Sequence, residues 1–303
     1  MNEGLTEADW WYVRLYPGGL EHLDEAVTSC LPPLVETALA GGSDRWFFIQ
    51  YTDWNGPHLR LRIHGPRHLL DSLHRRLPAL AIDCERLAGR APTERPLLLP
   101  LDLRPFVGRH AGADVAVYEP EDGKYGGPTG TRLAEEVFQH SSELALWGVG
   151  LARTPDRAAL AVLLLRGSVA ALQRVSPPEG VRPVSESQFW HRHFMWWTQD
   201  VGHAAEQLRT RLRDDAEQDR WGIEDRAESL ASDPVVRHRI EEWTSVVAAY
   251  LDRASHHAVP HSAAHLVFHQ AHMMLNRIGI LPREEALLGV LAARAEFVRD
   301  LPV

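Results

Sequence analysis

The chain has 303 residues, 45% of them hydrophobic, and a formal net charge of −9. This length and hydrophobic content suffice for a buried core, and the negative charge argues against non-specific nucleic-acid binding, which needs a surplus of Lys and Arg. The sequence starts without a basic region followed by an apolar run, and its most apolar segment, 158–165, is far shorter than the ~20 residues of a membrane span. We therefore expect a cytoplasmic protein that contacts neither nucleic acid nor membrane.

The first half of the chain predicts strands mixed with helices. An aromatic strand is expected over 10–16, followed by a helix over 21–39 that ends before two glycines. Residues 46–52 and 58–64 predict a hairpin, because the intervening Asn55-Gly56-Pro57 favours a turn. The remaining elements expected in this half are a helix over 67–80 and strands over 97–103 and 114–118.

Strand patterns nearly disappear after about residue 131. Six helices are expected instead, over 131–152, 155–175, 186–214, 233–256, 262–278 and 283–300. Strands followed by helices predict an α+β fold, with antiparallel strands in the N-terminal part and a mostly helical C-terminal part. We treat residues 1–303 as one domain. Two cysteines without ligand spacing predict neither a disulfide nor a thiolate metal site.

Residues 58–64 alternate between charged and apolar side chains. Because a strand points successive side chains to opposite faces, three apolar side chains would face the core. The other face would carry four cationic or potentially cationic groups, namely His58, Arg60, Arg62 and His64. Two interpretations stay open. The arginines either pair with carboxylates of a neighbouring strand or hold an anion in their planar forks.

Two further segments contain candidate chemistry. The acidic turn at 118–127 leads into a helix, and its Glu121 and Lys124 either serve as turn residues or orient the arginines. His261, His265 and His269 recur on one helical face, but the pattern lacks the glutamate and third ligand typical of zinc sites, so no metal is expected. A single histidine of this helix would suffice for acid–base chemistry. The aromatic cluster at 189–197 is predicted to be mostly core.

In chain order, these segments resemble the thiopeptide-type bacteriocin biosynthesis domain, a family that includes the C-terminal elimination domain of class I lanthipeptide dehydratases. The segments that carry the resemblance are WFFIQY at 46–51, PHLRLR at 57–62, YEPE at 118–121, KYGG at 124–127, AEEVF at 134–138, Ser141-Ser142, His272-Met273 and NRIG at 276–279. The resemblance covers nearly the whole chain in the same order.

The resemblance implies modification of a ribosomally synthesised precursor peptide. The expected reaction is β-elimination of glutamate from glutamylated Ser or Thr, which leaves dehydroalanine or dehydrobutyrine. The alternatives are a pyridine synthase that joins two dehydroalanines by formal [4+2] cycloaddition with release of the leader, and a non-catalytic adaptor that binds the leader peptide. A stand-alone form, a separate glutamylating protein as partner and a homodimer are implied as well, and no cofactor is expected.

Matching of the family motif suggests five catalytic residues, which are Arg60, Arg62, Glu121, Lys124 and His272. The arginines would stabilise the enolate and the leaving glutamate, and His272 would transfer the proton. Lys124 stands where eliminases of the family usually have arginine, and Ser141-Ser142 replaces a more usual Asp-Ser. We further predict substrate-binding roles for His58, His64, Tyr125, Asn276 and Arg277.

Overall fold

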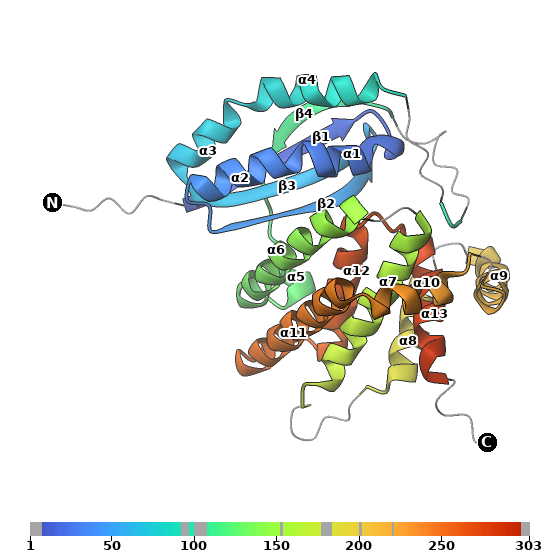
Figure 1. Cartoon of the computed structure of the whole chain (residues 1–303). Helices are drawn as coiled ribbons and strands as arrows, with labels where there is room; N and C mark the ends of the chain where they lie inside the picture. The colour runs from blue at the N-terminus through green and yellow to red at the C-terminus, as the bar shows by residue number, and fades with distance from the viewer. Residues whose placement is uncertain are drawn as a thin grey trace. The chain divides into compact units, whose positions relative to one another are not determined.

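The computed structural model describes residues 8–91, 97–99, 108–151, 154–176, 184–199, 202–219 and 221–297. They form two compact units (Figure 1). The sheet unit comprises the described parts of 1–96 and 100–120 together with 141–150, and the helical unit comprises 97–99, 121–140 and the described residues from 151 onward. The strands lie in the N-terminal part and helices dominate the C-terminal part, so the predicted α+β class is confirmed.

The sheet unit is built on four antiparallel strands. Their bounds are β1 (Ala8–Pro17), β2 (Arg45–Asp53), β3 (Gly56–Pro66) and β4 (Ala111–Ala116). The strand order is β2-β3-β1-β4, and the predicted hairpin is formed by β2 and β3. In the pairing of β1 with β3, Val13 lies opposite Leu61 and Leu15 opposite Leu59, so one face of the sheet is continuously apolar.

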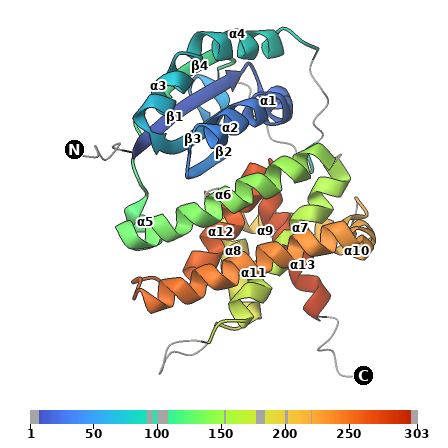
Figure 2. The ribbon, with the colours of Figure 1, turned by 60° about the vertical axis from the view of Figure 1, so that its left-hand side comes forward.

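That apolar face is the core of the sheet unit. The side chains of Val13, Leu15, Leu59, Leu61 and Ile63 are fully buried. Helices α1–α4 each pack against at least one of β1, β3 and β4 (Figure 2). The helical segments of this unit are η1 (Leu20–His22), α1 (Leu23–Ser29), α2 (Leu31–Ala40), α3 (Arg67–His74) and α4 (Leu77–Ala88).

Residues 141–150 of α6 (Pro128–Leu151) also belong to the sheet unit. The backbone N–H of Phe48 in β2 donates a hydrogen bond of 3.1 Å to the buried hydroxyl of Ser142. β2 is an edge strand of the sheet, so some of its backbone N–H groups lack a strand partner. Ser142, part of the Ser141-Ser142 motif of the sequence, therefore satisfies a backbone donor at this edge.

The helical unit is arranged around α7 (Thr154–Gln173), which contacts α10, α11, α12 and α13. Residues 158–162 of α7 are all buried, as expected for a helix that is apolar on every side. The other elements of this unit are α5 (Asp122–Tyr125), the first part of α6, α8 (Glu186–Trp196), η2 (Gly202–Ala204), α9 (Ala205–Glu217), α10 (Ile223–Ser232), α11 (Pro234–His256), α12 (Ala263–Arg277) and α13 (Pro282–Phe297). Across the described segments, no helix combines the length and apolar content needed to cross a bilayer.

Side-chain caps explain where several helices of this unit begin. Asp233 accepts hydrogen bonds from the backbone N–H groups of Val235 and Val236, and Pro234 occupies the first turn of α11. Ser262 caps α12 in the same way. A capping side chain satisfies backbone donors that have no partner within the helix, so these starting points are encoded locally.

The structure corrects several predicted elements. The helices predicted over 21–39 and 67–80 are each divided in two, and each second helix, α2 and α4, has proline in its first turn, where a missing N–H costs no hydrogen bond. The helix predicted over 186–214 is wrong as a single element, because α8 ends at Trp196 and Gly202 has a φ of 54°. Helix α10 was not predicted. Residues 97–99 form no strand, and the rest of the predicted strand 97–103 lies outside the described residues.

Candidate functional site

The face of the sheet opposite the core carries the basic strand residues. We call His58, Arg60, Arg62 and His64 of β3 the arginine face. The predicted alternation is confirmed, because the three apolar residues between them are fully buried while the side chains of Arg60, Arg62 and His64 are partly exposed. In the antiparallel register, Tyr12 lies opposite Arg62 and Arg14 opposite Arg60, so β1 adds an aromatic ring and a further cation to this face.

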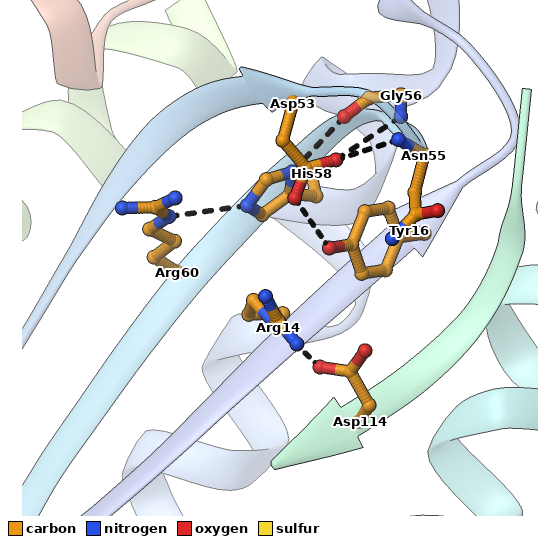
Figure 3. Close-up of polar contacts among 8 residues, drawn as sticks. All are labelled: Arg14, Tyr16, Asp53, Asn55, Gly56, His58, Arg60 and Asp114. Carbon is orange, nitrogen blue, oxygen red and sulfur yellow. Dashed lines mark hydrogen bonds and ion pairs between the residues drawn. The ribbon is translucent and has the colours of Figure 1, made fainter. Parts of the chain in front are cut away.

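Arg60 is held by a network at the β2–β3 turn (Figure 3). Its Nε donates a hydrogen bond of 3.1 Å to Nε2 of His58, and Nδ1 of His58 donates one of 3.0 Å to the carbonyl oxygen of Gly56. The Arg60 guanidinium also lies 3.4 Å from the ring centroid of Tyr51. Its terminal nitrogens point away from His58, so a ligand could use them without breaking this network.

These hydrogen bonds require neutral His58, with its proton on Nδ1. Burial lowers the pKa of His58, and the neighbouring arginines lower it further. Next to it, Asp53 accepts hydrogen bonds from the Tyr16 hydroxyl at 2.9 Å and from the backbone N–H groups of Asn55 and Gly56 (Figure 3). Burial raises the pKa of Asp53, but these donors and His58 outweigh it, so the pKa is lowered. The turn thus contains a fixed negative charge close to a neutral imidazole.

Arg14 and Arg60 of the sheet differ in their carboxylate partners. Arg14 of β1 donates a hydrogen bond of 2.6 Å to Asp114 of β4, so the neighbouring carboxylate pairs with Arg14 (Figure 3). Arg60 forms no ion pair with a carboxylate within the described parts of the chain. A guanidinium held through Nε, with its terminal nitrogens available, is suited to bind an anion in bidentate fashion.

Arg62 has different surroundings from Arg60. Its guanidinium carbon lies 4.5 Å from the ring centroid of Tyr12, 5.2 Å from that of Tyr118 and 5.5 Å from that of Phe47. Rings at these distances attract a cation through their negative faces. Arg62 is therefore fixed among aromatic side chains that come from three separate segments of the sheet unit.

His64 and His58 are both engaged with residues of the protein. Nδ1 of His64 lies 2.5 Å from Asp44, and its ring contacts that of Trp10. His58 is fully buried. The substrate-binding roles of these two histidines stay predictions, and the structure shows how each is positioned.

In the helical unit, the acidic turn packs onto α12. Nε2 of His261 donates a hydrogen bond of 2.9 Å to the carbonyl oxygen of Gly123, and Nε2 of His265 donates one of 3.0 Å to that of Lys124. The ammonium of Lys124 lies 3.3 Å from a carboxylate oxygen of Glu121. The histidine stripe noted in the sequence thus fixes α5, and it brings Glu121 and Lys124 beside α12, the helix that carries His272.

His272 belongs to a buried cluster with Glu285 and His193, which we call the His–Glu–His cluster. Nδ1 of His272 lies 2.7 Å from one carboxylate oxygen of Glu285, and Nε2 of His193 lies 3.0 Å from the other. Burial opposes ionisation of Glu285, but the two histidines outweigh it and lower its pKa to about 2. Among the described residues, Nε2 of His272 has no hydrogen-bond partner, so this nitrogen is available for proton transfer.

The remaining predicted binding residues are largely interior. Tyr125 and Arg277 are fully buried, whereas Asn276 is partly exposed. Arg277 donates a hydrogen bond of 2.9 Å to the carbonyl oxygen of Met273, and its guanidinium lies 5.1 Å from the ring centroid of Phe138. In this structure Arg277 stabilises the packing of α12 against α6. Contact of Tyr125, Asn276 and Arg277 with a substrate stays a prediction.

His269 makes the helical unit sensitive to acid. Burial, followed by the positive charge of Lys124, lowers the pKa of His269 to about 3 from its ordinary 6.5. The unfolded chain therefore binds a proton there at a pH where the folded chain does not, so folding stability falls as the pH drops from about 6.5 to about 3. We expect His269→Gln to lose part of this dependence in thermal unfolding at about pH 7.5 and about pH 5. Equal acid sensitivity of variant and wild type would contradict this, and exposed His238, replaced in the same way, is the control.

A protein-family model matches most of the chain. The family model described as lantibiotic biosynthesis dehydratase, C-terminal part, matches residues 10–295. The chain belongs to this family. A comparison with curated proteins found no match to this chain.

Three solved structures share its fold. They are the tRNA-dependent lantibiotic dehydratase MibB from Microbispora sp. 107891 (TM-score 0.61, 22% identity), TsrL (TM-score 0.63, 17% identity) and TbtD, a pyridine synthase from thiomuracin biosynthesis (TM-score 0.62, 18% identity). The match covers 99% of this chain but only 29% of MibB, whereas it covers 97% of this chain and 96% of TsrL, and 94% of this chain and 97% of TbtD.

Several residues that hold the candidate groups were not predicted from the sequence. Glu285 was recognised only as part of a helix, and His193 only as part of an aromatic cluster. Asp53 lies directly before the hairpin turn, where acidic residues are common for structural reasons, so its sequence position carried no signal. A buried carboxylate under His272 was in principle detectable as acid on an otherwise apolar helix face, but 13 residues separate the two positions and no local spacing rule connects them.

Proposed function

We propose that this protein removes glutamate from glutamylated serine or threonine of a ribosomally synthesised precursor peptide. The observation that carries the proposal is the state of Arg60, which is held through Nε and has no carboxylate partner in the described residues. The family match supports a role in lantibiotic-type peptide modification. An arginine left available in this way fits a reaction in which a carboxylate departs and negative charge develops on the substrate.

The proposed step is a β-elimination. His272 accepts the α-proton of the glutamylated residue through Nε2, and the electron pair of the broken C–H bond delocalises into the carbonyl as an enolate. When the enolate collapses, the Cα–Cβ double bond forms and the Cβ–O bond to glutamate breaks, so glutamate leaves as a carboxylate. Arg60 and Arg62 stabilise the enolate and the leaving group, and Glu121 with Lys124 orients these groups.

A second candidate is a pyridine synthase. The observation that favours it is Lys124, which stands where eliminases of the family usually have arginine. In that reaction two dehydroalanines are aligned and joined, and water and the leader peptide are then expelled. The Lys124 ammonium provides charge without a planar fork, which matters less for cycloaddition than for bidentate binding of glutamate.

Mass spectrometry separates the two candidates. The purified protein is incubated with a synthetic peptide that carries one O-glutamylated serine, and in parallel with a leader-bearing peptide that contains two dehydroalanines. Elimination predicts loss of one glutamic acid from the first peptide, and cycloaddition predicts a macrocycle and a released leader from the second. If the first peptide keeps its glutamate while the second is cyclised, the elimination proposal is wrong.

The same proposal includes the partners and location of the reaction. In this proposal a separate protein glutamylates the peptide, and both steps would take place in the cytoplasm. Residues 1–303 would act as one functional domain, and a homodimer is part of the expectation from the family.

A further inference from the structure

The His–Glu–His cluster contains more than a proton-transfer group needs. Glu285 is fully buried on α13 and contacts one histidine of α12 and one of α8. His193 is fully buried as well, while 16% of the side chain of His272 is exposed. Burying an ionised carboxylate is costly unless it is paired and hydrogen-bonded. The second, inaccessible histidine helps to meet this cost, and the question is what it does for His272.

The hydrogen bonds determine which nitrogen of each ring carries a proton. An ionised carboxylate only accepts hydrogen bonds, so His272 donates through Nδ1 and His193 donates through Nε2. His272 is therefore left with Nε2 as its basic nitrogen. The ring of Trp197 packs on His272 with a centroid separation of 4.4 Å, which restricts the orientation of the imidazole ring.

The surroundings of His193 restrict where positive charge can reside. Its Nδ1 is buried and has no hydrogen-bond partner among the described residues, and the rings of Phe189, Trp190 and Phe268 lie around the imidazole. A second proton on His193 would place an unsatisfied N–H donor in an apolar environment, which is unfavourable. A further proton taken up by the cluster is therefore accommodated on Nε2 of partly exposed His272.

We infer that His193 and Glu285 are a buried pair of positioning residues, which fixes His272 in the Nδ1–H tautomer and directs positive charge to His272 when its Nε2 accepts a proton. Glu285 supplies the negative charge, and His193 holds the carboxylate in the orientation that His272 requires. This inference deepens the proposed elimination and rests on it for its kinetic consequence. The tautomer itself is independent of the reaction.

The tautomer is measured directly by NMR. In ¹⁵N-labelled wild-type protein, long-range ¹H–¹⁵N spectra distinguish a protonated from an unprotonated ring nitrogen, and the signals of His272 are assigned by their absence in His272→Gln. We expect protonated Nδ1 and unprotonated Nε2 near neutral pH, and loss of this preference in Glu285→Gln. A wild-type His272 protonated on Nε2 alone would overturn the inference, whether or not the protein eliminates glutamate.

Three variants test the role of His193. His193→Phe removes the donor, whereas His193→Gln keeps an N–H that can reach Glu285. Gly289→Ala leaves the cluster chemically intact, but its added Cβ would lie 2.6 Å from Nδ1 of His193 and displace the ring. We expect His193→Phe and Gly289→Ala to lower kcat for glutamate elimination by about 10- to 100-fold with little change in KM. His193→Gln should retain most of the wild-type kcat.

Kinetic pH profiles separate positioning from a purely structural role. Loss of the carboxylate in Glu285→Gln should move the acidic limb of the kcat/KM profile to lower pH, because positive charge on His272 is then less stabilised. His238→Gln, which changes an exposed histidine of α11, is the control and should leave the profile unchanged. Wild-type turnover that persists with an unchanged profile in folded His193→Phe, Gly289→Ala and Glu285→Gln would overturn the inference. Absence of glutamate loss in the wild type would instead contradict the proposed function.

Discussion

Replacing Arg60 by alanine is expected to slow glutamate elimination by about a hundredfold or more, since preorganised donors at a developing negative charge contribute effects of this size. The network that holds Arg60 explains the expected magnitude. Its Nε is fixed by His58 and its guanidinium lies against Tyr51, so the cation is already in place before the substrate becomes charged. The measurement is the rate of glutamate loss from an O-glutamylated peptide, followed by mass spectrometry under single-turnover conditions.

Two comparisons make the Arg60 experiment specific. Arg60→Lys retains a positive charge but loses both the planar fork and the Nε bond to His58, so we expect only a small part of the rate to return. Arg67→Ala removes an exposed arginine at the start of α3, which pairs with Asp71, and should leave the rate unchanged. Full turnover of folded Arg60→Ala would show that this side chain does not stabilise the reaction.

His272→Ala is expected to reduce elimination by about 100- to 10,000-fold, the range typical of a lost acid–base group. This variant removes the only nitrogen of the His–Glu–His cluster that combines an available lone pair with partial exposure in the described structure. It also leaves Glu285 with a single donor, so part of the effect on stability will come from a less satisfied buried carboxylate. Thermal unfolding must therefore accompany the rate measurement.

The controls for His272 follow from its surroundings. His272→Gln retains a donor toward Glu285 but has no basic nitrogen, so it should restore folding stability without restoring the rate. His238→Ala changes an exposed histidine and should behave as the wild type. If His272→Gln eliminated glutamate as rapidly as the wild type, the base would have to be another residue, and the proposed assignment would fail.

The arginine face and the His–Glu–His cluster differ in how far sequence could predict them. Alternation correctly assigned residues 58–64 of β3 to the two faces of the sheet, because side-chain direction in a strand is a local property of the backbone. The partners of those residues were not predictable. Asp114, a hundred residues away from Arg14, pairs with Arg14 rather than Arg60, and this depends on the position of β4 next to β1.

Helix boundaries likewise were predicted where the signal is local and missed where it is not. The start of α11 at Asp233-Pro234 was predicted because the cap lies within the first turn. The separation of α8 from α9 was missed, because the aromatic and charged pattern continues past the break. Similarly, His272 was selected by resemblance, while Glu285 and His193 were identified only once α8, α12 and α13 had been placed together.

The sequence alone thus determined the α+β class, the basic face of β3 and the residue types available for proton transfer, since these follow from periodicity, capping and composition over short distances. Tertiary structure decided that Arg60 bonds to neutral His58 instead of a carboxylate, and that His272 is backed by a buried carboxylate shared with a second histidine. Such pairings join groups from separate elements, and their energies depend on burial and orientation that only the folded chain establishes.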